Sequence, residues 1–313
     1  MRNKCVVGLD IGGTYCRMGL VDRMNRLYHP YICNTMDLNG DKNFVNGLMA
    51  FIKSYINLHE KEYEIQAISM GFPSTIDHER KVVLSTPNIE GLDNVSIVDL
   101  YEEEFKIPVY INRDVNMLMY HDLEELKIPK GGVTLGFYIG TGFGNAIYIN
   151  GEILLGKHGV AGELGHIPVI GNKKKCSCGN EGCIEAVAAG RYLEELCKTK
   201  FPETNIKDIY VKHGDAPEII EQIEYLSIPI ASEINIFDPH HIILGGGILQ
   251  MEGFPRKLLE EFVVKHTRKP YPAYGLNFLY TLDEQENGII GAGIYGHHRL
   301  TVANNKCYLA TAD

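Results

Sequence analysis

The sequence predicts an α/β protein with mostly parallel sheets, built from two similar halves. Apolar strand-like runs alternate with amphipathic helical segments along the 313 residues, which is typical of sheets covered by helices. A strand, a turn rich in glycine and threonine, and a second strand occur in that order twice, around residues 10–14 and 140–144. No low-complexity linker separates the halves. We therefore expect one domain over residues 1–115 and a larger one over residues 116–286, with the boundary inside structured sequence.

The first half is predicted to open with a β-hairpin and to continue with helices and strands in alternation. Apolar or alternating runs predict strands at residues 5–9, 17–22, 65–70, 81–85 and 109–112. Apolar residues at helical spacing predict helices at residues 42–59, 98–105 and 115–126. Arg113 and Asp114 are therefore expected at a strand–helix junction.

The second half repeats this plan after its own glycine turn. The same patterns predict strands at residues 133–139, 145–149, 242–244 and 277–281. They predict helices at residues 186–200, 217–236, 254–266 and 287–300. We expect the last of these helices to pack back on the first domain. Residues beyond Leu300 show no clear pattern.

Composition narrows the classes of partner. Forty acidic residues against thirty lysines and arginines give a formal net charge of −10, which argues against broad electrostatic binding to nucleic acid or to an acidic membrane. No stretch has the length and apolar character of a signal peptide or of a membrane span. We therefore expect a cytoplasmic protein with no nucleic-acid or membrane partner, whose cysteines are reduced unless they bind metal.

Three glycine-rich segments at strand ends indicate a bound nucleotide. Glycines allow the backbone to approach phosphate oxygens and to direct N–H groups at them. The candidate nucleotide-binding residues are Gly12, Gly13, Thr14, Gly140, Thr141, Gly142, Gly144, Gly245, Gly246 and Gly247, the last three expected beneath an adenine or ribose. Asp10, just before the first turn, can hold Mg²⁺ through water. Each segment alone could be an ordinary turn, whereas the three together favour a nucleotide and its phosphates.

Three of the eight cysteines cluster in the second half and need their own explanation. His166 is followed by Cys176, Cys178 and Cys183, and one histidine with three cysteines suits a closed tetrahedral zinc site. The alternatives are a disulfide with a free thiol, or inert core cysteines. A reducing compartment and the compact spacing favour structural zinc. The five scattered cysteines are expected to be small apolar fillers.

Taken together, the motifs resemble the signature of the ROK family (repressors, open reading frames, kinases). The signature runs from the turn at residues 139–144, through Gly-Val-Ala-Gly-Glu-Leu-Gly-His at 159–166, to Cys-x-Cys-Gly-x-x-Gly-Cys-x-Glu at 176–185. Further matches at residues 10–14, 113–116 and 244–247 extend the resemblance over essentially the whole chain. The resemblance implies a two-domain, actin-like (ribonuclease H-like) ATPase fold.

Within the family, the stretches at residues 85–88, 113–116, 158–168 and 235–239 look most like the D-allose kinases. ROK sugar kinases transfer the γ-phosphoryl group of ATP to a hexose hydroxyl, usually O6, with Mg²⁺ on the phosphates. The resemblance therefore implies ATP, Mg²⁺ and structural Zn²⁺ as cofactors and a hexose as the small-molecule partner. D-Allose 6-phosphate would be the product. Whether the protein forms a homodimer is left open.

The resemblance also implies roles for individual residues. Asp114 matches the family's catalytic base, although an aspartate there could simply be a helix N-cap. The residues that match sugar-binding positions are Asn88, Arg113, Asn116, Glu163, His166 and Glu185. Whether Asn116 contacts sugar or buttresses the Asp114 turn stays open. His166 would bind zinc with one ring nitrogen and face the sugar with the other.

Arg113 departs from the pattern of many glucose-type members, which carry asparagine at this position. A guanidinium is larger, charged and can only donate hydrogen bonds, which counts against glucose and fits the allose-like subgroup. Other ROK hexose kinases and N-acetylmannosamine kinases remain alternatives, as does a non-catalytic sugar sensor. ROK repressors carry an extra N-terminal helix-turn-helix, and a phosphate turn at residue 10 is expected to leave no room for one.

Overall fold

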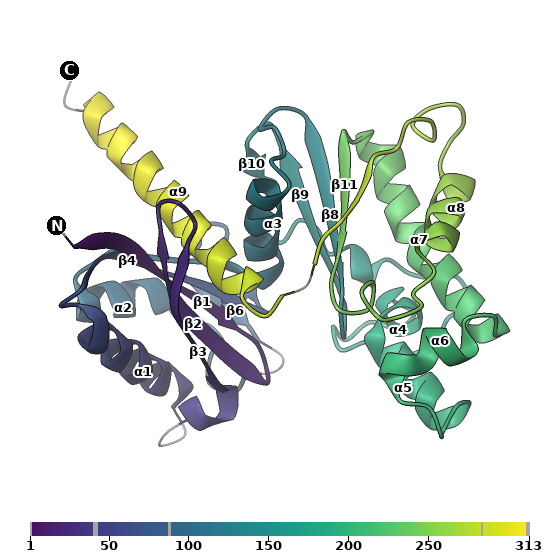
Figure 1. The fold of residues 1–313 in the computed structure, drawn as a ribbon, viewed down its shortest axis with the longest axis horizontal. Coiled ribbons are helices and arrows are strands. Elements are labelled where there is room, and N and C mark those ends of the chain that lie inside the picture. Colours follow the sequence, from purple (N-terminus) through teal and green to yellow (C-terminus); the bar gives the residue numbers. More distant parts are fainter. Residues whose placement is uncertain (1, 40–42, 87–88, 283, 311–313) are drawn as a thin grey trace. The chain divides into compact units, whose positions relative to one another are not determined.

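A computed structural model of the chain describes residues 2–39, 43–86, 89–282 and 284–310, and divides into two compact units (Figure 1). Unit 1 consists of Met1–Ile128, Leu155–Val160 and Glu284–Asp313, and unit 2 of Pro129–Leu154 and Ala161–Asp283. Unit 1 thus runs on past residue 115, the boundary expected from the sequence. It also includes two segments from later in the chain. None of the described helices is long and apolar enough to span a lipid bilayer.

Unit 1 contains a five-stranded sheet in the order β3-β2-β1-β4-β7. Its strands are β1 (Asn3–Ile11), β2 (Tyr15–Asp22), β3 (Leu27–Asn34), β4 (Tyr63–Phe72) and β7 (Val109–Arg113). Strand β2 is antiparallel to both β1 and β3, whereas β1, β4 and β7 run parallel. A separate short hairpin pairs β5 (Thr75–Ile76) with β6 (Val83–Ser85).

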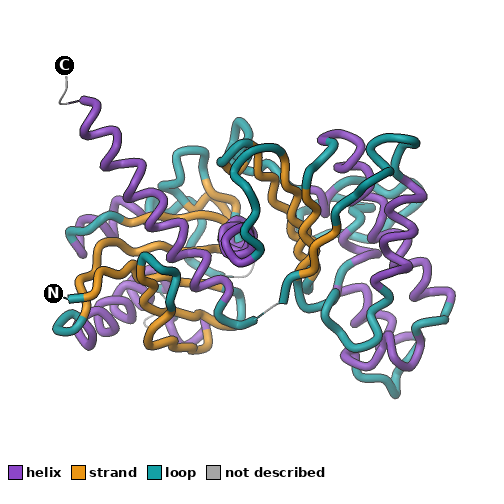
Figure 2. Tube along the Cα trace, turned by 45° about the horizontal axis from the view of Figure 1, so that its top comes forward, coloured by secondary structure: helices purple, strands orange, loops and turns teal. Residues whose placement is uncertain are grey.

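Helices cover both faces of the first sheet. Helices α1 (Phe44–His59) and α2 (Ile97–Phe105) share a core with the odd-numbered residues of β1, from Cys5 to Ile11. Successive strand residues point to opposite faces. The even-numbered Gly8 therefore faces α9 (Asn287–Ala310), and a Cβ on Gly8 would lie 2.4 Å from the Ile289 carbonyl. Figure 2 shows α9 crossing this sheet.

Helix α9 also packs closely on α3 (Asp114–Glu125), because a Cβ on Gly291 would collide with the Met117 carbonyl oxygen. The helix continues to Ala310, beyond Leu300, where the sequence shows no clear pattern. Thr301 and Ala303 are exposed. Exposed helix needs no apolar stripe, so the sequence carries no periodic pattern there.

Unit 2 repeats the strand plan of unit 1. Its sheet has the order β10-β9-β8-β11-β12, with strands β8 (Val133–Ile139), β9 (Phe143–Ile149), β10 (Glu152–Ile153), β11 (His241–Gly245) and β12 (Phe278–Tyr280). The hairpin strands β8, β9 and β10 are antiparallel, and β8, β11 and β12 are parallel. The α/β class and the repeated half predicted from the sequence are confirmed.

The helices of unit 2 pack with its sheet in one continuous core. They are α4 (Glu185–Ala188), α5 (Gly190–Thr199), α6 (Ile209–His213), α7 (Pro217–Phe237) and α8 (Arg256–His266). The sequence predicts one helix over 186–200, but the chain becomes extended at Ala189, with φ −95° and ψ −177°. The N–H groups that follow donate to the turn between β8 and β9 instead of continuing α4.

Candidate functional site

The first glycine turn connects β1 to β2 in unit 1 and is anchored by Thr35. The Gly12 N–H donates to the Tyr15 carbonyl at 2.9 Å, which closes the hairpin. Thr35 donates twice to the turn, from Oγ1 to the Gly12 carbonyl at 2.6 Å and from its N–H to the Thr14 carbonyl at 2.9 Å. In a planar trans peptide, a carbonyl and the next N–H point in opposite directions. The Gly13 N–H therefore points away from Thr35, as a phosphate-binding donor would.

Asp10 lies in β1 just before this turn and pairs with Arg17 of β2. Arg17 Nη1 is 3.3 Å from Asp10 Oδ2, and both side chains are about three-quarters buried. A carboxylate beside a phosphate turn fits a magnesium ion bound through water. Arg17 was missed by the sequence reasoning. Its signal is that it stands directly opposite Asp10 in the hairpin register.

Asp10 and Asp114 lie at the same edge of the first sheet. Asp10 is in register with Gly71 of β4, and Gly71 is in register with Asn112 of β7. Asp114 begins α3 directly after β7 ends. Gly71 lies close to the start of α3, since a Cβ there would be 3.0 Å from Met117 Cγ and 3.5 Å from Asp114 Cα. Ligands of open α/β sheets bind beyond the carboxyl ends of the strands, which is where both carboxylates are.

Asn112 fixes the turn between β7 and α3. Its Oδ1 accepts from the Arg113 N–H at 2.9 Å and from Asn116 Nδ2 at 2.8 Å. Asp114 Oδ1 accepts from the Val115 N–H at 2.7 Å, which orients the carboxylate in the first turn of α3. Asn116 is only 3% exposed. Asn116 could either contact sugar or support the Asp114 turn, and this arrangement favours support of the turn. Its contact with sugar stays a prediction.

The second glycine turn, between β8 and β9 of unit 2, is anchored by the start of α5. The Gly140 carbonyl accepts from the Gly190 N–H at 2.9 Å, and the Thr141 carbonyl accepts from the Arg191 N–H at 3.2 Å. By the same peptide geometry, the N–H groups of Thr141 and Gly142 point away from α5. In both glycine turns, carbonyl groups thus accept hydrogen bonds from the rest of the unit, and the adjacent N–H groups point away from it.

The third glycine segment follows β11 and packs on the end of β8. Gly246 has φ +95°, and a Cβ there would lie 2.5 Å from the Ile139 backbone nitrogen. The Ile248 N–H donates to the Ile139 carbonyl at 3.0 Å. Gly245 ends β11, and Gly247 is exposed. The segment therefore lies against the residue that precedes the second turn, a position that suits a nucleoside beside its phosphates.

Glu185 connects the second turn to the candidate sugar-binding residues. Its Oε2 accepts from the Phe143 N–H at 2.8 Å. A Cβ on Gly142 would lie 2.6 Å from this oxygen, and a Cβ on Gly165 would lie 3.6 Å from it. Gly144, expected in the turn, lies within β9.

Glu163 and His166 lie at the two ends of a 3₁₀ turn, η3 (Leu164–His166), which contains Gly165. Glu163 Oε2 is 3.6 Å from His166 Nε2, and the two side chains are 43% and 28% exposed. With Glu185 beside Gly165, unit 2 brings three candidate sugar-binding residues together. Carboxylate oxygens accept hydrogen bonds from sugar hydroxyls. Asn88, a further candidate, lies outside the described residues.

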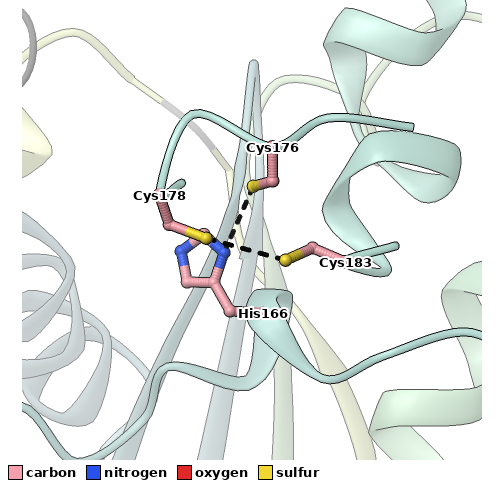
Figure 3. Close-up of side chains that lie close together, drawn as sticks. All are labelled: His166, Cys176, Cys178 and Cys183. Atoms are coloured by element: carbon pink, nitrogen blue, oxygen red, sulfur yellow. Dashed lines mark hydrogen bonds between the residues drawn. The ribbon is translucent and has the colours of Figure 1, made fainter. Parts of the chain in front are cut away.

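His166, Cys176, Cys178 and Cys183 form a compact donor cluster in unit 2 (Figure 3), whose ligand atoms all lie within 4.8 Å of one another. The sulfurs of Cys178 and Cys183 are 3.6 Å apart, and Cys176 Sγ is 3.5 Å from His166 Nδ1. Tetrahedral donors at roughly 2.0–2.3 Å from Zn²⁺ are about 3.3–3.8 Å apart. The cluster therefore fits the structural zinc site that the sequence predicts.

His166 connects this cluster to the sugar-binding candidates. Its Nδ1 faces Cys176, whereas its Nε2 faces Glu163. One ring can therefore bind a metal and present its other nitrogen to a ligand. Burial, together with hydrogen bonding to Cys178 and Cys176, raises the pKa of the Cys183 thiol to about 12. A bound cation would have to displace that proton.

A buried carboxyl group supports the strand that follows the second turn. Glu233 of α7 is 3% exposed, and its Oε2 accepts from Asn145 Nδ2 of β9 at 2.8 Å. Burial raises the pKa of Glu233 from 4.5 to about 7, and the Asn145 bond offsets part of this shift. The folded protein therefore holds this proton more tightly than the unfolded chain. The resulting stability is present below about pH 4.5 and is lost as the pH rises through about 7.

Glu233→Gln should remove this pH dependence, because a neutral amide can still accept from Asn145. The rise in the pKa of Glu233 from 4.5 to about 7 corresponds to about 3 kcal/mol in the free energy of unfolding. Relative to wild type, the variant should gain up to that free energy of unfolding between pH 5 and pH 8.5, measured by urea titration. Glu203→Gln, at an exposed glutamate, is the control and should show no such gain. Parallel pH profiles for wild type and Glu233→Gln would contradict the prediction.

Comparison with known proteins agrees with this geometry. The family model described as "ROK family" matches residues 6–298. The glucokinase of Halalkalibacterium halodurans is 27% identical over 94% of this chain and 95% of its own. The ROK hexokinase structure from Thermus thermophilus has a TM-score of 0.76 and 26% identity, covering 95% of this chain and 99% of its own. The N-acetylglucosamine repressor of Escherichia coli is 30% identical over 66% of this chain and 54% of its own.

Two α/β units with one strand plan, each with a glycine turn at the carboxyl edge of its sheet, have the actin-like ATPase fold of the ROK structures to which the chain is similar. The chain belongs to the ROK family. It is similar to a glucokinase along nearly the full length of both proteins, which places it with the sugar kinases of that family.

Proposed function

We propose that this ROK protein is an ATP-dependent kinase that phosphorylates D-allose at O6 to give D-allose 6-phosphate. The observation that carries the proposal is the Arg113–Asp114 junction, which sets a carboxylate at the carboxyl edge of the first sheet with a buried guanidinium residue directly before it. The sugar kinase class is supported by the glucokinase relatives. The choice of allose rests on Arg113 and on the stretches that resemble allose kinases.

In this proposal Asp114 is the general base that accepts the proton of the attacking hydroxyl. The Val115 N–H holds the carboxylate in the first turn of α3, where the helix N-terminus stabilises negative charge. The two glycine turns bind the phosphates through backbone N–H groups. Asp10 would hold Mg²⁺, which neutralises the charge that develops on the phosphates during transfer.

Recognition of the sugar falls to Glu163, His166 and Glu185, which unit 2 holds together. Allose differs from glucose only in the orientation of the C3 hydroxyl. A site that hydrogen-bonds one orientation rejects the epimer, because its own polar groups would be left without partners. We assign this discrimination to Glu163, Asn88 and Arg113, the residues that match sugar-binding positions and include the departure from the glucose-type pattern.

A sugar panel tests the proposal. With Mg²⁺ and ATP, kcat/KM for D-allose should exceed that for D-glucose by at least about tenfold, since a hydroxyl-reading site discriminates strongly. Arg113→Asn should narrow this ratio, because it replaces the guanidinium with the asparagine that many glucose-type members carry at this position. Mass spectrometry and NMR of the product should locate the phosphate on O6. If glucose or N-acetylmannosamine were better than allose by tenfold or more, the allose assignment would fail and the kinase proposal would survive.

The match to a repressor favours one further candidate, a non-catalytic sugar sensor. The two functions differ in whether any hexose stimulates ADP release. Binding of a hexose without ADP release in the presence of Mg²⁺ and ATP would support the sensor and contradict the kinase.

A further inference from the structure

The polypeptide enters unit 1 for only six residues between two stretches of unit 2. Leu155–Val160, here called the strap, belongs to unit 1, whereas the residues up to Leu154 and from Ala161 onward belong to unit 2. Glu163 follows the strap by three residues and His166 by six. The strap therefore directly precedes the residues assigned above to sugar recognition.

Arg80 and a glycine fix the strap within unit 1. Arg80 Nη2 donates to the Gly159 carbonyl at 2.9 Å, and Nη1 donates to the Ile76 carbonyl at 3.3 Å. Gly159 has φ +78°, and a Cβ there would lie 2.8 Å from the Ile76 oxygen and 2.9 Å from the Asp77 oxygen. The strap thus lies directly on the backbone of the β5–β6 hairpin. Only glycine permits this approach.

Arg80 is buried and has a strained backbone, unlike an ordinary surface arginine. The residue is 6% exposed and has φ +57°, in the left-handed region. Burial lowers the pKa of Arg80, Tyr295 opposes this effect, and the neighbouring Arg113 adds to it. A buried cation is costly unless it is hydrogen-bonded, and the two carbonyls accept from its two terminal nitrogens. Few other side chains could replace it, because the guanidinium donates in two directions at once.

The other end of the connection is fixed in unit 2. Gly162 has φ +88°, and a Cβ there would lie 2.6 Å from the Asn145 carbonyl oxygen. Only Val160 and Ala161 separate Gly159 from Gly162. Three residue steps reach at most about 10–11 Å when fully extended. Only Val160 and Ala161 can therefore absorb a displacement of the strap, and whatever they do not absorb strains Gly162, the residue directly before Glu163.

We propose that Arg80 is a positioning residue for the sugar site: it holds the strap on unit 1 and so sets where Glu163 and His166 lie. The proposal rests on the proposed function, because it takes these two residues as sugar ligands. Arg80 touches neither sugar nor nucleotide in this role. It acts through the backbone of residues 159–163, and misplacement of a binding group by about 1 Å can cost up to about 10²-fold in rate.

Two measurements on Arg80→Met and Arg80→Lys test the role. Hydrogen exchange in peptides covering residues 155–166 should be faster in Arg80→Met, while peptides from β8 and α7 keep wild-type rates. The KM for the sugar should rise about tenfold, while the KM for ATP changes less than twofold. Lysine keeps the charge and one donor, so Arg80→Lys should recover part of the loss.

Two further variants make the test specific. Gly159→Ala disturbs the same contact from the strap side and should reproduce the rise in sugar KM. Arg2→Met is the matched control, because Arg2 also donates to a backbone carbonyl, that of Glu60 at 2.7 Å, but is exposed. It should leave both KM values unchanged.

The outcomes separate this inference from the proposed function. Unchanged exchange of residues 155–166 in Arg80→Met, or equal rises in both KM values, overturns the positioning role. If wild type binds no hexose in calorimetry, the proposed function fails. Glu163 and His166 are then no sugar ligands, and the positioning role is overturned with it.

Discussion

Replacing Asp114 with asparagine should lower kcat by about 10²–10⁴-fold and leave the fold intact, the usual loss for a positioned base. Asparagine has the same shape, and its side-chain oxygen can still accept the 2.7 Å hydrogen bond from the Val115 N–H. The amide cannot take the proton of a sugar hydroxyl at neutral pH. Turnover at saturating sugar and ATP, with thermal unfolding of the same preparations, measures both expectations.

Asp99→Asn provides the matched control. Asp99 is also an acidic residue in the first turn of a helix of unit 1, α2, and its Oδ2 accepts from Ser96 Oγ at 2.9 Å. Its side chain is 58% exposed, and the same chemical change there should leave kcat at the wild-type value. Turnover of Asp114→Asn close to wild type would reduce Asp114 to a structural residue at the start of α3.

The second large effect should follow loss of the zinc site. Metal analysis should find one Zn²⁺ per chain, and Cys183→Ser should lose it together with stability and sugar binding. Cys183 is 1% exposed, and its carbonyl and the carbonyl of Ile184 accept the N–H groups that start α4. Glu185 lies two residues beyond Cys183 and accepts from the Phe143 N–H in the second turn. Without the metal, both this carboxylate, a candidate for sugar binding, and the second turn should lose their support.

Cys197→Ser tests whether the effect is specific to the cluster. Cys197 lies in α5 and is not one of the four clustered donors. This variant should keep its zinc, its melting temperature and its sugar KM. Fully active, folded protein that contains no zinc would overturn the structural role of the metal.

Most elements could be predicted because residues that face a core recur at a fixed spacing. Helix α1 buries Phe44, Leu48, Ile52 and Tyr55, and this repeat is visible in the sequence. Strand β3 was missed for the opposite reason. It is an edge strand whose side chains are mostly exposed or half-buried, so it needs no alternation of apolar and polar residues.

The site shows the same division between local and distant signals. The four candidate zinc donors lie within 18 residues of one another, from His166 to Cys183, so their spacing alone indicates a cluster. Arg80 and Gly159 are 79 residues apart, and Asn145 and Glu233 are 88 apart. No local pattern links such pairs, because the contact exists only once the two segments have folded together. Asn112 lies close to the predicted base in the sequence, but only the structure shows that it accepts hydrogen bonds from Arg113 and Asn116.

The packing of α9 has a consequence for how the protein is made. The ribosome completes all of unit 2 before it reaches this helix, yet α9 covers the sheet face around Gly8 in unit 1. Chains emerge from the N-terminus, and domains fold as their residues become available. Unit 1 must therefore wait with one face of its sheet uncovered until α9 has left the ribosome. Of the two units, the one whose synthesis begins earlier is thus the one whose core is completed later.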